Sequence, residues 1–193
     1  MTSSSWLALD SAQVAEARGI AESRVDLHAI LPNPVFPAYP RRVTFTEDAR
    51  VFCRAFWDWA TSARAGGAGT IILGALSDSR TPPLRPPGWV LIPSDATSVQ
   101  YMEVVHGDGQ SVQPVYSDSV VIVPDTKRWA LWLDVHLEIA VLGDFAGVDL
   151  PSQPYGTDVE GAIDVMRLAH SSLDLFETRA DTLRSSYPRS QAP

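Results

Sequence analysis

Apolar runs separated by turn-forming residues occupy the middle of the chain, which is the pattern of a β-sheet. Residues 70–76 are apolar almost throughout and are bounded by turn signals, so they predict a strand that is buried in the centre of a sheet. Residues 89–93 predict a second strand. The apolar stretch 129–142 is too long for one strand, so we expect a turn at 134–136. A meander of three strands follows, at 119–123, 129–133 and 137–142.

Helical spacing of apolar residues marks both ends of the chain. Residues 11–22 predict a short amphipathic helix, and 46–64 predict a second helix that is capped by Thr46. Near the C-terminus one apolar stripe from Val159 to Leu183, with Thr157 and Glu160 as a capping box, predicts a single long helix. We expect the tail 185–193 to be frayed.

Three other segments carry weaker patterns. Residues 24–31 alternate between polar and apolar positions, as a half-buried strand does, and the four prolines of 32–40 predict an extended connector. Residues 98–106 and 110–116 flank a Gly-Asp-Gly turn and predict a hairpin. Strands in the middle and helices at both ends give one α+β domain over 1–193, in which helices cover one face of a largely antiparallel central sheet.

The charge balance bears on possible partners. The chain has 193 residues, 45% of them hydrophobic, and a net charge of -8, which excludes collagen-like and wholly disordered classes. No basic run is longer than a pair such as Arg41 and Arg42, and a pair alone does not form a patch, so we expect neither nucleic acid nor a membrane as a partner. The net negative charge favours a basic protein surface as partner. The alternative is that the charge only keeps the protein soluble.

The single cysteine, Cys53, excludes an intrachain disulfide and fits a reducing compartment. The first residues lack the basic region and long apolar stretch of a secretory signal, and no apolar run is long enough for a membrane-spanning helix. We therefore expect a cytoplasmic protein. No phosphate loop, dinucleotide fingerprint or zinc motif is found, so no cofactor is predicted.

Two patterns leave enzymatic alternatives open. Asp134, His136 and Glu138 share parity, so on one regular strand they face the same side and suit a divalent metal of a hydrolase. A turn at 134–136 makes the same residues a polar hairpin tip. A second possibility is a catalytic pair in which Cys53 is the nucleophile and a histidine is the base. The four histidines are His28, His106, His136 and His170. The alternative is a small buried hydrophobe, since Cys53 lies inside a predicted helix.

Six tryptophans suit either a sheet covered by helices or a partner-binding face. The segment 129–143 (WALWLDVHLEIAVLG) resembles a hairpin of bacterial immunity proteins of polymorphic-toxin systems, in which a tryptophan-rich strand, a polar turn and an apolar strand recur. The resemblance implies a protein inhibitor that blocks a toxin. It identifies no particular toxin.

The leading hypothesis is therefore a non-enzymatic protein-binding domain of the immunity type. Acidic loop residues would steer a basic toxin domain and aromatic residues would anchor it. A third hypothesis is a small-ligand domain with an apolar pocket between the sheet and the C-terminal helix. The sequence predicts no oligomeric state. The candidate partner-binding residues are Asp78, Asp108, Tyr116, Asp118, Trp132, Asp134, Glu138 and Asp144.

Overall fold

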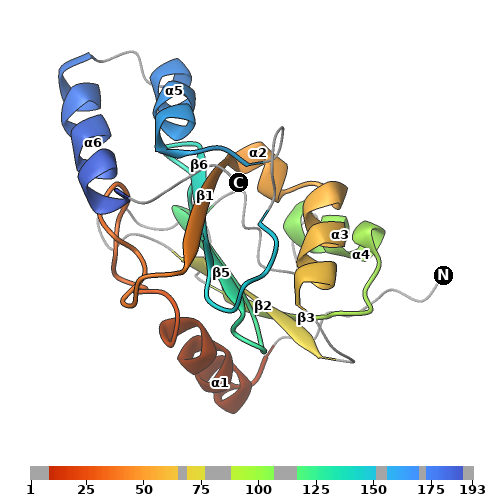
Figure 1. Cartoon of the computed structure of the whole chain (residues 1–193). Coiled ribbons are helices and arrows are strands. Elements are labelled where there is room, and N and C mark those ends of the chain that lie inside the picture. The colour runs from red at the N-terminus through yellow and green to blue at the C-terminus, as the bar shows by residue number, and fades with distance from the viewer. Residues whose placement is uncertain are drawn as a thin grey trace.

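Six antiparallel strands form one sheet, and helices pack on both of its faces (Figure 1). The computed structural model describes residues 9–64, 69–76, 88–106, 117–150, 156–169 and 173–188. The strands are β1 (Arg42–Glu47), β2 (Thr70–Leu76), β3 (Gly88–Pro93), β4 (Ser119–Pro124), β5 (Trp129–Asp134) and β6 (Ile139–Asp144). The helices are α1 (Ser11–Glu22), α2 (Asp48–Val51), α3 (Arg54–Ala63), α4 (Ser98–His106), α5 (Val159–Ala169) and α6 (Leu173–Ser186).

The strand order is β1-β6-β5-β4-β2-β3, and every neighbouring pair is antiparallel. The predicted meander of β4, β5 and β6 is confirmed, with its turn after Asp134. β1 joins the sheet beside β6 and pairs in turn with Thr157, which precedes α5. The α+β fold with a largely antiparallel sheet is thus confirmed.

Two apolar cores lie on the two faces of the sheet. One core joins α1, α5 and α6 to residues such as Phe45, Trp132 and Val141. The other joins α2, α3 and α4 to residues such as Leu73 and Trp129. Our expectation that helices cover one face was wrong, because alternate residues of β4, β5 and β6 are apolar on both sides and both sides are buried.

Gly74 shows how closely the sheet packs. A Cβ atom at this position would lie 2.6 Å from Cζ3 of Trp89, on the neighbouring strand β3. The indole ring therefore lies directly over the backbone of β2, and glycine is the residue that allows it.

Before the C-terminal region, three predicted elements differ from the structure. Residues 24–31 form turns, because the Asp26 carboxylate accepts the backbone N–H of His28 and bends the chain. The helix predicted over 46–64 is divided into the end of β1, α2 and α3, with a break at Phe52 and Cys53. Residues 98–106 form helix α4, and the other predicted arm of that hairpin, 110–116, lies outside the described residues.

The C-terminal helical region is present, and its apolar stripe is divided between α5 and α6, which pack side by side (Figure 1). The cap of α5 is Asp158, whose carboxylate accepts the N–H of Gly161, and not the predicted pair of Thr157 and Glu160. The tail begins later than expected, since α6 extends to Ser186 and Tyr187 is buried. The hydroxyl of Tyr187 accepts the N–H of Val35 at 3.1 Å.

Candidate functional site

One end of the sheet gathers carboxylates from four segments. They are Glu47 at the end of β1, Asp48 at the start of α2, Asp118 before β4, Asp134 at the end of β5, and Glu138 before β6. The antiparallel pairing places the end of β1 beside the start of β6, and the start of β4 beside the end of β5. We refer to Glu47, Asp48, Asp118, Asp134 and Glu138 as the acidic end.

Asp134 shapes the turn between β5 and β6. Its Oδ1 atom accepts the backbone N–H groups of His136 and Leu137, each at 3.0 Å. The side chain is buried, and burial raises the pKa of the Asp134 carboxyl, although these hydrogen bonds and the charges of His136 and Arg179 lower it. Asp134 therefore holds the turn, and its burial makes it a support of the acidic end and not the exposed contact that we expected.

Glu138 and His136 project from this turn. Glu138 is exposed and has a φ of 56°, in the left-handed region, so it sits at the tip of the connection. His136 has a side-chain exposure of 73%, and its Nε2 lies 2.9 Å from Oδ1 of Asp118. The backbone of Asp118 is fixed on both sides, because its N–H donates to Leu76 and its carbonyl accepts from Val135.

Asp48 links α2 to the same turn. Its backbone N–H donates to the carbonyl of Glu138 at 3.1 Å. Burial raises the pKa of the Asp48 carboxyl, the hydrogen bond from Ala49 lowers it, and the charges of Glu138 and Glu47 raise it further. The negative charges of Glu138 and Glu47 therefore disfavour the ionised form of Asp48.

Glu47 and Asp48 were not predicted as members of this group, because we placed them in the first turn of a helix. The signal for strand β1 was the run Val43 to Thr46, in which three of four residues are β-branched and the fourth is phenylalanine.

Two of the predicted partner-binding residues are buried elsewhere. Trp132 has an exposure of 1% and lies in the core under α5 and α6, so it is wrong as an exposed anchor. Asp144, at the opposite end of β6, has an exposure of 0%, and its Oδ1 accepts the N–H groups of the three residues 146–148. Asp78, Asp108 and Tyr116 lie outside the described residues.

The enzymatic alternatives find little support in this geometry. Asp134 is buried while His136 and Glu138 are exposed, so the turn separates the three. Within the described ranges, no group of three histidine, cysteine, aspartate or glutamate residues could hold a metal ion.

Cys53 is not inside a helix, as we expected, but is the N-cap residue of α3. Its thiol donates to the carbonyl of Arg50 at 2.8 Å. Nε2 of His106 lies 3.1 Å from the carbonyl of Phe52, so this ring is held by backbone. His28 is exposed, and His170 lies outside the described part of the chain.

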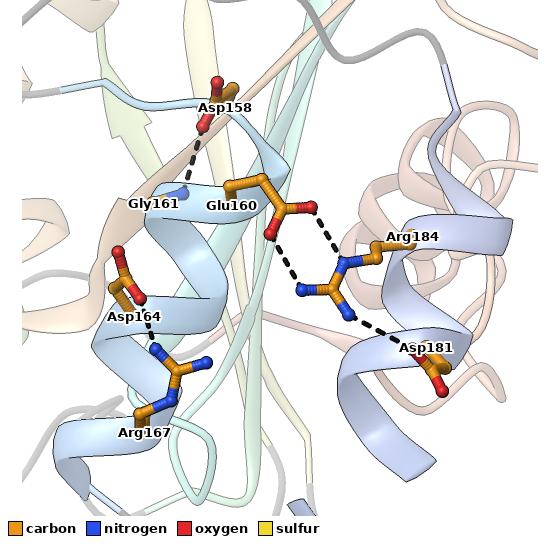
Figure 2. A network of polar contacts seen from close by, with 7 residues as sticks. All are labelled: Asp158, Glu160, Gly161, Asp164, Arg167, Asp181 and Arg184. Carbon is orange, nitrogen blue, oxygen red and sulfur yellow. Dashed lines mark hydrogen bonds and ion pairs between the residues drawn. The ribbon is translucent and has the colours of Figure 1, made fainter. Parts of the chain in front are cut away.

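A second polar network joins the two C-terminal helices (Figure 2). The guanidinium of Arg184 on α6 forms two hydrogen bonds of 2.8 Å with the carboxylate of Glu160 on α5, and a third of 3.1 Å with Asp181. On α5, Arg167 also pairs with Asp164. All of these side chains remain open to solvent, so we interpret the network as a clamp between α5 and α6.

We expect the contribution of this clamp to depend on pH. The hydrogen bond from Arg184 and its charge lower the pKa of Glu160 below its ordinary value of 4.5. Because the folded-state pKa is depressed, the stabilisation is present above about pH 4.5 and is lost as the pH falls through the folded pKa. The difference in Tm between the wild type and Glu160→Gln should therefore be larger at pH 7 than at pH 3. Glu16→Gln, which breaks no ion pair, serves as the control, and an equal difference at both pH values would contradict the prediction.

No family model, no curated protein and no solved structure matches this chain. None of the helices in the described residues is long and apolar enough to cross a lipid bilayer. The function therefore has to be inferred from the geometry of the surface.

Proposed function

We propose that this chain is a non-enzymatic protein-binding domain of the immunity type, which blocks a toxin by binding a basic surface of it at the acidic end. The observation that carries the proposal is the convergence of carboxylates from β1, α2, β4 and the turn between β5 and β6. Glu138 stands at the tip of this surface, Asp118 lies beside the same turn, and Asp48 adds negative charge from the neighbouring segment, where the carboxylate of Glu47 is paired with Arg50.

The stiffness of this surface supports the proposal. The backbones of Asp48 and Asp118 are hydrogen-bonded to neighbouring segments, and Asp134 fixes the turn that carries Glu138. A rigid surface loses little conformational entropy on binding, and complementary charge raises the rate of association. Both properties suit an inhibitor that must capture its target quickly.

The test uses the products of the genes adjacent to the one that encodes this chain. If one of them arrests growth when it is expressed alone, we expect co-expression of this chain to restore growth and the two purified proteins to form a complex. If no adjacent product is toxic and none binds this chain, the proposal is wrong.

Charge reversal at the tip of the acidic end should weaken that complex. For Glu138→Lys we expect Kd to rise by about tenfold or more, mainly through slower association, and the loss to shrink at high salt. Surface plasmon resonance at two salt concentrations measures this. Glu16→Lys on α1 makes the same charge change away from the acidic end and should bind as the wild type does. Equal effects of the two variants would show that only net charge matters.

A further inference from the structure

The opposite end of the sheet gathers positive charge from three segments that are far apart in the sequence. Arg24 follows α1, Arg41 precedes β1, and Lys127 and Arg128 form the turn between β4 and β5. Hydrogen bonds to backbone carbonyls bring these segments together. Nε of Arg24 donates to the carbonyl of Lys127 at 2.9 Å, and the N–H of Phe145 donates to the carbonyl of Arg128 at 2.8 Å. We refer to Arg24, Arg41, Lys127 and Arg128 as the basic end.

Phe145 lies at the centre of this group. The guanidinium carbon of Arg24 is 4.7 Å from the centroid of the Phe145 ring, and the N–H of Arg41 donates to the carbonyl of the adjacent Asp144 at 2.6 Å. Residues 144 and 145, at the end of β6 and the start of the next loop, therefore contact both Arg24, which follows α1, and Arg41, which precedes β1.

None of the four cations of the basic end forms an ion pair within the described residues, whereas six other arginines do. Two neighbouring acids, Asp125 and Asp144, are already engaged. Asp125 receives the guanidinium of Arg64 and the N–H of Thr70. Asp144 receives the loop N–H groups through Oδ1, and its Oδ2 lies 3.6 Å from Nε of Arg42.

Arg128 adds an independent observation. Its Nε atom is buried and has no hydrogen-bond acceptor in the described part of the molecule. Buried donors are almost always paired in folded proteins, and a guanidinium donor is satisfied best by an anionic oxygen. In a chain of net charge -8, four cations that share one end of the sheet and form no ion pair within the described residues are unexpected unless they meet an anion.

We propose that the basic end binds a compact, multiply charged phosphate-bearing anion, of the kind presented by a di- or triphosphate group. Arginine forks match the geometry of phosphate oxygens, and Lys127 adds a point charge beside them. The small size of the group favours a compact anion. A six-residue strand spans about 20 Å, so the acidic end lies only about that distance from the basic end. The acidic end therefore repels an extended polyanion such as DNA or an anionic membrane.

This inference is independent of the proposed function, because it concerns the other end of the strands. Contiguous basic runs in the sequence are no longer than two residues, whereas the basic end is assembled from three separate segments.

The test is isothermal titration calorimetry of the full chain with sodium pyrophosphate at low ionic strength, with inorganic phosphate, a DNA duplex and phosphatidylserine vesicles as further arms. We expect saturable binding of pyrophosphate with a submillimolar Kd, weaker binding of phosphate, and weaker binding still of DNA and vesicles. Each of Arg24→Gln and Arg128→Gln should raise the pyrophosphate Kd about tenfold. Arg54→Gln, which removes an exposed arginine of α3 that forms no ion pair in the described residues, should change Kd less than twofold.

Because Arg128 is partly buried, its variant needs a check of folding by Tm. The double variant Arg41→Gln, Lys127→Gln removes more exposed charges and keeps the test decisive if Arg128→Gln does not fold. The proposal is overturned if pyrophosphate does not bind, if binding survives in every folded variant of the basic end, or if DNA or vesicles bind more tightly than pyrophosphate.

Discussion

Replacement of Asp144 by alanine should lower the free energy of unfolding by about 3–5 kcal/mol. The carboxylate of Asp144 has an exposure of 0%, and its Oδ1 accepts three backbone N–H groups at 2.7 to 2.9 Å. The loop that these bonds close passes through Gly147, at a φ of 74°, and Arg42 also donates to its last member, Val148. In the alanine variant all three donors lose their acceptor at once. Urea denaturation measures the loss.

Two other substitutions separate this explanation from a simple loss of charge. Asp144→Asn keeps an acceptor oxygen in place and should lose less than half as much stability as Asp144→Ala. Glu138→Gln removes an exposed carboxylate and should change the free energy of unfolding by less than about 0.5 kcal/mol. If Asp144→Ala were as stable as Glu138→Gln, the carboxylate would not hold the loop.

The second large effect is expected at Trp132. Its indole is buried between the sheet and the helices α5 and α6, so Trp132→Ala should lower the free energy of unfolding by about 3–5 kcal/mol through loss of apolar burial and formation of a cavity. Trp132→Phe keeps a ring in this space and should lose markedly less. Chemical denaturation of the two variants provides the comparison.

Tyr39 is the matched exposed aromatic, with an exposure of 79%, and Tyr39→Ala should change stability little. The same set of variants tests the discarded assignment of Trp132 as a partner anchor. That assignment would be restored if Trp132→Ala kept its stability but failed to bind the partner.

The strands were predictable from sequence where burial leaves a continuous apolar run. β2, β4, β5 and β6 lie within such runs, and each was located to within two residues at either end. Whether helices cover one face of the sheet or both was harder to predict. Trp129 and Trp132 differ in parity and therefore point to opposite faces, but parity does not show whether a face is covered by a helix or by solvent.

The helix ends show why local signals succeed or fail. α4 begins with a capping box, in which the side chains of Thr97 and Gln100 each accept the backbone N–H of the other residue. This signal was present in the sequence, but the β-branched residues of the segment suggested a strand. The pair Thr157 and Glu160 has the same spacing, yet Thr157 pairs with Phe45 of β1 and Glu160 faces Arg184. Tertiary contacts thus decided between two equal local patterns.

The acidic end was predictable only in part for a related reason. Asp118 and Glu138 were identified because they flank predicted strands, and the structure places them at one end of the sheet. Asp144 flanks the same strand as Glu138 but lies at its other end, so an acidic residue beside a turn had two possible roles that the sequence did not separate. Only the strand order shows which carboxylates share an end.

The position of β1 has a consequence for how the protein folds. β1 pairs with β6, so each of its residues meets a partner that is synthesised about a hundred positions later. A chain emerging from the ribosome therefore carries β1 without its neighbour until nearly three-quarters of the sequence has been made. Closing this long loop makes the pairing of β1 non-local and slow, and β1 is the strand for which a chaperone would have most time to act.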